Sequence, residues 1–161
     1  MSSKSFTVSL KSKIKSYKRI INVDPDKSLS IRSFLIGSIC QKVSIADNIL
    51  ESEDIKSSIL ACRKLGIKII RIKPQKYKIY GKGLGSFYAK KNSQLNFGNS
   101  GTLARLLIGI LSTTPNIEVN IKGDHSLNKR NMKEIIKLMS KFGASFLPKN
   151  KFKFPLKLIS T

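Results

Sequence analysis

Basic side chains stand next to serine, asparagine or glycine at three places in this chain, and these residue types bind anions. The three clusters are Lys27–Arg32, Asn99–Arg105 and Lys129–Arg130. An ammonium group attracts phosphate or carboxylate as a point charge, whereas a guanidinium forks over two oxygens. Each cluster alone is typical of a solvated surface. Three clusters, each at a predicted turn or helix start, favour a site for a phosphorylated or carboxylated ligand.

A glycine-bearing turn distinguishes the second cluster. Gly98 and Gly101 flank Asn99-Ser100, and an apolar helical pattern follows directly. Glycine lets the backbone approach a ligand, and free N–H groups at a helix N-terminus attract negative charge. Asn99 or Ser100 can cap the helix. The same letters occur at ordinary helix entries, so this stretch alone indicates a turn into a helix.

The excess of basic over acidic residues indicates which kinds of ligand the chain could bind. The 161 residues include 31 Lys and Arg against 9 Asp and Glu, for a formal net charge of +22. Such a balance suits nucleic acid, an anionic membrane or small polyanionic substrates. The lysines are spread along the whole chain, and aromatics make up only 7% with no Trp. This pattern favours a generally basic surface over a dedicated nucleic-acid interface.

Cysteine and histidine usage predicts neither disulfides nor a metal. Cys40 and Cys62 stand apart in apolar helical patterns, as expected of reduced core thiols in a cytoplasmic protein. The single His125 cannot supply a histidine cluster. No apolar run reaches the roughly 18 residues of a membrane span, and no signal peptide is expected at the N-terminus.

The elements that must position these clusters alternate between helix and strand. Apolar residues spaced three and four apart predict helices over 28–40, 52–66, 100–111 and 132–143, with Ser28 or Ser30 capping the first. Shorter apolar stretches predict strands over 6–10, 20–23, 43–50, 67–72, 77–80, 117–121, 144–147 and 152–158. Residues 81–85 and 123–130 are expected to be loops.

Two of these helices repeat one pattern. Ile55, Ile59, Cys62 and a closing Gly66 recur 77 residues later as Met132, Ile136, Met139 and Gly143. The unit is longer than a solenoid repeat. The fold class expected is therefore α/β, with pseudo-symmetric repeats of alternating helices and strands.

Four stretches together resemble the enolpyruvyl transferase family, in order and in spacing, from about residue 20 to the end. They are Asp26–Arg32, Leu50–Asp54, Gly98–Arg105 and Gly123–Arg130. Within the family, the match is to the carboxyvinyltransferases that act on shikimate 3-phosphate. The sister enzymes that use UDP-N-acetylglucosamine are an alternative, but Ser28 and Arg32 argue against them. A basic nucleic-acid-binding module is the alternative from another class.

The resemblance implies a reaction and the residues that bind its substrates. The family transfers the enolpyruvyl group of phosphoenolpyruvate to the 5-hydroxyl of shikimate 3-phosphate, releases phosphate and needs no cofactor or metal. Six residues match its substrate-binding motifs. Lys27 would contact both substrates, Ser28 and Arg32 would bind shikimate 3-phosphate, and Asn99, Gly101 and Arg130 would bind phosphoenolpyruvate. Arg105 is expected to be structural, and the catalytic acid and base are not assigned.

The sequence departs from the family pattern in three residues and in length. Pro25 stands where the family has Gly, Ile31 replaces a polar residue, and Asn131 stands where it has Pro. The resemblance further implies an inside-out α/β barrel of three units in each of two domains. Residues 1–20 would pack with the second domain, and 21–161 would form about two units of the first. The chain is therefore expected to be an N-terminal fragment, inactive alone, that a C-terminal fragment could complement.

Overall fold

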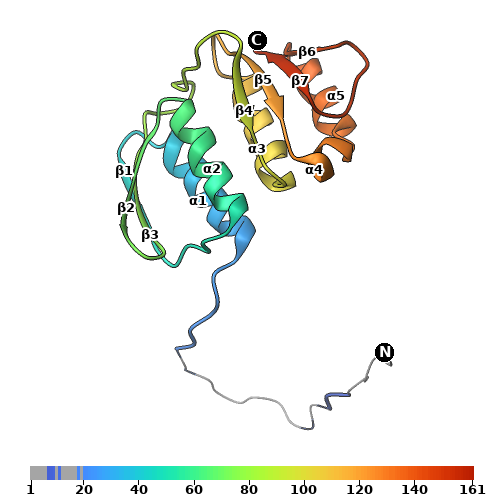
Figure 1. Ribbon diagram of the computed structural model, residues 1–161. Helices are drawn as coiled ribbons and strands as arrows, with labels where there is room; N and C mark the ends of the chain where they lie inside the picture. Colours follow the sequence, from blue (N-terminus) through green and yellow to red (C-terminus); the bar gives the residue numbers. More distant parts are fainter. Residues whose placement is uncertain (1–6, 10, 12–17, 19) are drawn as a thin grey trace.

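The computed structural model describes residues 7–9, 11, 18 and 20–161, which form two α/β units side by side (Figure 1). The first unit has two helices and three strands: α1 Lys27–Ile39, β1 Val43–Ala46, α2 Glu53–Lys64, β2 Lys68–Lys73 and β3 Lys76–Tyr80. Its sheet has the order β1-β3-β2, and both pairings are antiparallel.

The second unit has the same plan with one more strand and one more short helix. Its elements are β4 Ser93–Asn96, α3 Gly101–Ser112, β5 Glu118–Lys122, α4 His125–Lys129, α5 Lys133–Lys141, β6 Ser145–Leu147 and β7 Leu156–Ile159. The sheet has the order β4-β5-β7-β6. The added strand β4 pairs with β5 in parallel, whereas the other two pairings are antiparallel.

Strand register confirms the predicted repeat. Ile69 lies opposite Ile79 in the first sheet, and Phe146 lies opposite Leu158 in the second, all four side chains being buried. Positions 69 and 146 differ by 77, the offset found in the sequence. The helices α2 and α5 are each followed by a glycine at positive φ, Gly66 at 86° and Gly143 at 97°, as expected where a helix ends in the left-handed region.

One continuous hydrophobic core joins the two units. The helix α1 packs against both α2 and α3, and α3 packs against α5, so the units meet through their helices. Figure 1 shows α1 and α2 between the first sheet and the second unit. Edge-to-face ring pairs reinforce each half, Phe34 with Tyr77 in the first and Phe97 with Phe154 in the second. This packing fixes the ends of α1, α2 and α3 relative to one another.

Several expectations about elements were wrong. Residues 20–23 form no strand, and Ile20 is 99% exposed. The cap of α1 is Asp26 rather than Ser28 or Ser30. The strand β4 was missed because Leu95 is its single apolar residue. Part of the expected loop 123–130 is the helix α4.

Four further findings concern the last strand, the N-terminal segment, the cysteines and the length of the helices. The last strand begins at Leu156 rather than at 152. Of the strand expected over 6–10, Phe6 and Leu10 lie outside the described residues. Cys62 is buried as expected, but Cys40 is partly exposed. No helix in the part of the chain that the structure describes has the length and hydrophobicity to cross a bilayer.

Candidate anion-binding site

The N-termini of α1, α2 and α3 lie at one end of the molecule (Figure 1). Two contacts join them. Lys27 on α1 is 3.1 Å from Asp54 on α2, and a Cβ built on Gly98 before α3 would lie 2.6 Å from the Ser57 hydroxyl on α2. Each helix start carries backbone N–H groups without partners inside the helix. This end of the fold therefore gathers several partial positive charges.

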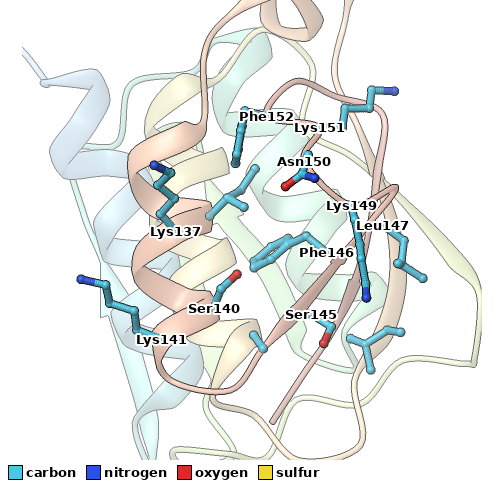
Figure 2. A pocket seen from close by; sticks show the side chains of 13 residues that line it. Lys137, Ser140, Lys141, Ser145, Phe146, Leu147, Lys149, Asn150, Lys151 and Phe152 are labelled. Carbon is cyan, nitrogen blue, oxygen red and sulfur yellow. The ribbon is translucent and has the colours of Figure 1, made fainter.

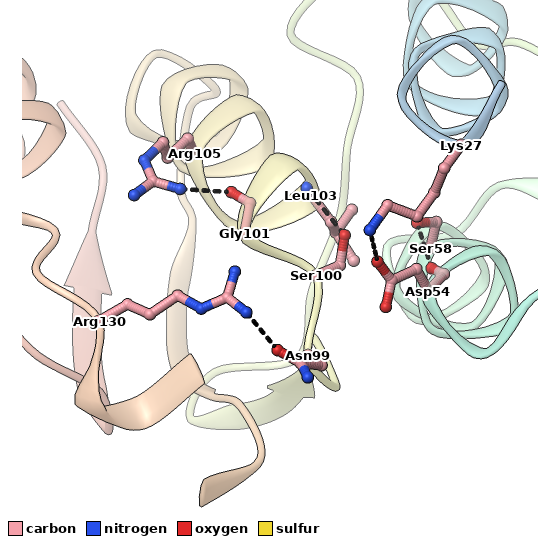
Figure 3. Close-up of polar contacts among 9 residues, drawn as sticks. All are labelled: Lys27, Asp54, Ser58, Asn99, Ser100, Gly101, Leu103, Arg105 and Arg130. Atoms are coloured by element: carbon pink, nitrogen blue, oxygen red, sulfur yellow. Dashed lines mark hydrogen bonds and ion pairs between the residues drawn. The ribbon is translucent and has the colours of Figure 1, made fainter. Parts of the chain in front are cut away.

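Side-chain capping fixes the start of α1. The carboxylate of Asp26 accepts a hydrogen bond from the Leu29 N–H at 2.7 Å, and the Ser30 hydroxyl donates to the Asp26 carbonyl. With the first turn fixed, the Lys27 ammonium reaches the Asp54 carboxylate, as Figure 3 shows. The side chain of Asp54 is 15% exposed and that of Lys27 is 52% exposed. The ammonium is thus anchored on one side and open to an incoming anion on the other.

The glycine turn before α3 brings its backbone close to two guanidinium groups. Ser100 caps the helix, its hydroxyl accepting from the Leu103 N–H at 3.2 Å. Gly101 is buried, and a Cβ placed there would lie 2.9 Å from an Nη1 atom of both Arg105 and Arg130. A larger residue would therefore fill the space beside both arginines.

Arg130 is placed by the short helix α4. Asp124 caps this helix through the Leu127 N–H at 2.7 Å, and its own N–H donates to the Gly98 carbonyl at 2.8 Å. Arg130 follows directly and donates from Nη2 to the Asn99 side-chain oxygen at 2.7 Å (Figure 3). Because a guanidinium has five N–H donors, this contact leaves capacity to bind an anion.

Of the six predicted residues, three form one group. Asn99, Gly101 and Arg130 touch one another, and Lys27 lies at the same end of the fold, across the α3 N-terminus from Arg130 (Figure 3). Ser28 is half-buried in the first turn of α1.

Arg32 lies apart from that group. It lines a groove of about 650 Å³ beside Leu29, Ile36 and Ile45, and within residues 20–161 it makes no hydrogen bond or ion pair. No hydrogen bond or ion pair among residues 20–161 joins Arg32 to the other predicted residues.

The structure adds one residue to the site and explains two others. Asp54 ends the Leu50–Asp54 stretch, for which the sequence predicts no binding role, and its contact with Lys27 shows that it anchors the ammonium. Arg105 donates to the Gly101 carbonyl of its own helix at 3.2 Å, which is a structural contact. Asn131, where the family has Pro, accepts from the Lys133 N–H at 2.8 Å and so fixes the entry to α5 by a side chain.

A second hollow, equal in volume to the groove beside Arg32, contains none of the predicted residues. It lies between α5 and the hairpin of β6 and β7, and measures about 650 Å³ (Figure 2). Four lysines line it beside the buried ring of Phe146, namely Lys137, Lys141, Lys149 and Lys151. Basic residues thus occur around hollows well away from the predicted site, as a net charge of +22 leads one to expect.

Perturbed carboxylates also lie outside the site. The Gln75 N–H, the Tyr77 hydroxyl and the Arg71 guanidinium bind Glu51 and hold its pKa below the ordinary value. Hydrogen bonding to Lys157, with a further contribution from Lys91, lowers the pKa of Glu118.

Burial raises the pKa of the Cys62 thiol to about 11, so this thiol stays protonated in the core. These groups serve stability rather than the site.

Fold and site together define an α/β protein of repeated units, with helix N-termini and two arginines gathered at one end. Comparison with known proteins makes the class specific: residues 11–160 match the family model of EPSP synthase (3-phosphoshikimate 1-carboxyvinyltransferase), and the chain belongs to this family.

Curated relatives and solved structures support the same family assignment. The chain is 36% identical over 146 residues to the 3-phosphoshikimate 1-carboxyvinyltransferase of Syntrophomonas wolfei, a match that covers 91% of the chain and 33% of the relative. It is 40% identical over 137 residues to that of Leptospira interrogans, covering 85% and 30%. The structure is similar to EPSP synthase from Acinetobacter baumannii, with a TM-score of 0.78 and 33% identity over 88% of this chain and 32% of that one.

The chain matches only part of each curated relative. It spans about a third of the length of the curated relatives that it matches. The fold of the matched part, including both repeated units, is thus shared with the family.

Proposed function

We propose that this chain is the substrate-binding part of an enzyme that transfers the enolpyruvyl group of phosphoenolpyruvate to shikimate 3-phosphate, in the cytoplasm. In that reaction the 5-hydroxyl oxygen bonds to C2 of phosphoenolpyruvate and loses its proton. The C2–O bond to phosphate breaks, and inorganic phosphate leaves with one proton more. The observation that carries the proposal is the group of Arg130, Asn99 and Gly101 opposite Lys27 at one end of the helices.

Each residue has a role that its position supports. Arg130 binds the carboxylate or phosphate of phosphoenolpyruvate through guanidinium donors that its contact with Asn99 orients. Gly101 keeps the α3 N-terminus open to the same anion. Lys27, held by Asp54, stands between the two substrates. Ser28 and Arg32 bind shikimate 3-phosphate, which requires the Arg32 side chain to turn toward the helix ends.

The chain supplies only one wall of such a site. The predicted residues at the helix ends are exposed apart from Gly101 and the half-buried Ser28, whereas catalysis of this kind needs a site from which water is excluded. We propose that the part of the relatives that this chain does not cover closes the site and supplies the acid and base. A separate C-terminal fragment could play that part.

Binding and turnover, measured separately, test the proposal. Isothermal titration of the 161-residue chain with shikimate 3-phosphate and with phosphoenolpyruvate should show weak binding of both, and phosphate release should be absent. Adding the uncovered C-terminal portion of the Acinetobacter baumannii enzyme should restore phosphate release. Strong turnover by the chain alone would contradict the one-wall model. Binding of UDP-N-acetylglucosamine in place of shikimate 3-phosphate would refute the substrate assignment.

A further inference from the structure

The first sheet is covered on one side only. The helices α1 and α2 pack against its strands from that side, and Figure 1 shows no described element on the other. Ala46, Ile69 and Ile79 are buried beneath the helices. Successive side chains of a strand point to opposite faces of a sheet, so the neighbours of these residues lie on the uncovered side.

Strand register arranges six side chains on the uncovered side in two rows, which we call the outer face. The first row is Val43, Tyr80 and Lys68, and the second is Ile45, Lys78 and Ile70. The three aliphatic side chains are 40% to 53% exposed. The two ammonium groups lie 5.0 and 5.3 Å from the centroid of the tyrosine ring. The outer face thus mixes aliphatic and basic side chains around one aromatic ring.

No acidic side chain balances these two lysines. Neither of them makes an ion pair within residues 20–161. The acids next to the sheet have other partners, since Asp47 pairs with Lys76 and Glu51 with Arg71. The outer face therefore carries uncompensated positive charge beside exposed apolar surface.

The repeat shows which residues of the two sheets correspond. Ile79 aligns with Leu158, because their strand partners are 77 residues apart. On their other sides these two residues face Ser44 of β1 and Val119 of β5. The strands β1 and β5 thus hold the same place in the two sheets.

The second sheet shows that this fold does not need an aliphatic outer face. At the places of Val43 and Ile45, the strand β5 has Glu118 and Asn120. Glu118 pairs with Lys157, so the second sheet neutralises a charge of the kind that the first sheet leaves unpaired. The architecture is the same, yet only the first sheet exposes aliphatic side chains at these places, which points to a contact outside the fold.

We propose that the outer face binds the surface of an anionic lipid bilayer. The aliphatic side chains enter the boundary between headgroups and acyl chains, and the lysine ammonium groups stay with the lipid phosphates, because a lysine buries its stem and keeps its charge hydrated. The outer face points away from α1 and α2, so binding leaves the anion-binding end of the helices free. The proposal makes no use of the proposed reaction.

The position of Lys78 favours a bilayer over a protein partner. It lies on the middle strand, between Ile45 and Ile70. A protein partner would have to desolvate this ammonium at the centre of the contact, where interfaces are depleted of charge. At a bilayer surface the same group meets phosphate and water.

The surroundings of Tyr80 favour a bilayer over nucleic acid. Proteins that bind single strands stack bases on open aromatic rings. Tyr80 is the one aromatic residue among the six, and Lys68 and Lys78 lie over its ring. The aliphatic neighbours offer a base no hydrogen bond, whereas all three fit the apolar part of a lipid.

Vesicle binding by charge-matched variants tests the proposal. The full 161-residue chain should sediment with phosphatidylcholine vesicles that contain about 30% phosphatidylglycerol. A net charge of +22 attracts any anionic surface, so Lys78→Gln is compared with Lys137→Gln on the exposed side of α5. Lys78→Gln should weaken binding about fivefold and Lys137→Gln less than about twofold. Equal losses, or equal binding to vesicles of phosphatidylcholine alone, would overturn the proposal.

A second pair of variants keeps the charge and tests the aliphatic contact. Ile45→Ser combined with Ile70→Ser should weaken binding to the same vesicles at least about fivefold, because less apolar surface enters the bilayer. The control is Leu106→Ser combined with Leu138→Ser, which removes leucines of similar exposure, 38% and 49%, from the helices of the second unit. The control should bind as the unsubstituted chain does. No loss in the isoleucine variant would refute insertion.

Fluorescence gives a readout that holds even if the serine variants fail to fold. The chain has no Trp, so Tyr80→Trp places a single indole in the outer face, and Phe142→Trp places one at a 61% exposed position of the second unit. With the anionic vesicles, the emission of Tyr80→Trp should shift to the blue, as expected of an indole at a membrane interface, and that of Phe142→Trp should not.

Two outcomes of the fluorescence experiment would refute the proposal. One is the absence of a blue shift in Tyr80→Trp. The other is a shift with single-stranded DNA or polyglutamate but not with vesicles, which would assign the outer face to nucleic acid or to an acidic protein.

Discussion

At the scale of single residues, the site depends on the fork of one guanidinium. Arg130 donates to Asn99 at 2.7 Å and lies beside the backbone of Gly101. We expect Arg130→Lys to weaken phosphoenolpyruvate binding about tenfold, a loss of about 1.4 kcal/mol, because an ammonium cannot bind Asn99 and two anion oxygens in one plane. Titration calorimetry at fixed salt measures this change. Arg105→Lys is the control, since Arg105 bonds within its own helix, and an equal loss there would indicate a general charge effect.

Gly101 makes a second residue-scale prediction. A Cβ on Gly101 would lie 2.9 Å from the ends of Arg105 and Arg130, which are flexible side chains that can move aside. Gly101→Ala should therefore change the free energy of unfolding by less than about 1 kcal/mol, while phosphoenolpyruvate binding falls at least tenfold as the arginines are displaced.

The matched control is Gly109→Ala in the same helix, where a Cβ meets nothing within 4 Å. It should leave binding unchanged and stabilise the chain by about 0.5–1 kcal/mol. Unchanged binding in Gly101→Ala would show that the anion does not approach this turn.

At the scale of elements, capping decides where α1 begins. The sequence pattern predicts Ser28 or Ser30 as the cap, whereas the structure uses Asp26. We expect Asp26→Ala to destabilise the chain by about 1 kcal/mol, because the Leu29 N–H loses its partner. Ser28→Ala should cost less than about 0.5 kcal/mol. Urea unfolding of both variants measures the difference, and the reverse order would restore the cap expected from the sequence.

The elements also show what sequence patterns can and cannot reveal. The four longer helices were predictable because their apolar stripes repeat every three or four residues, whereas the five-residue helix α4 was expected to be a loop. The strand β4 was not, because Leu95 alone carries its burial and its pairing with β5 depends on distant residues. The same distinction between local patterns and long-range contacts applies to the site. Local turns predicted the anion clusters, but the contacts of Arg130 with Asn99 and of Lys27 with Asp54 span 31 and 27 residues, which spacing alone does not reveal.

At the scale of the whole molecule, a few ionised carboxylates oppose a large positive charge. Glu51 joins the loop before α2 to the β2–β3 hairpin through the Gln75 N–H at 3.1 Å, the Tyr77 hydroxyl at 2.9 Å and the Arg71 guanidinium at 2.7 Å. These bonds favour the carboxylate and hold its pKa below 4.5, the ordinary value. The unfolded chain then binds the proton more readily than the folded chain. The stabilisation is complete above pH 4.5 and is lost as pH falls through the lowered pKa.

We therefore expect the urea midpoint of the chain to fall between pH 5 and pH 3, and Glu51→Gln to flatten that fall while lowering the midpoint at pH 7. Protonation at low pH also adds positive charge to a chain that already carries +22, so added salt should raise the acid-side midpoint of both forms by screening.

Glu53→Gln is the charge-matched control. It removes the same charge from an 85% exposed side chain whose ion pair is to Lys56 in its own helix turn. If Glu51→Gln kept the full fall of the urea midpoint between pH 5 and pH 3, the hairpin network would not set the acid stability. The net charge of the whole chain would then be the cause.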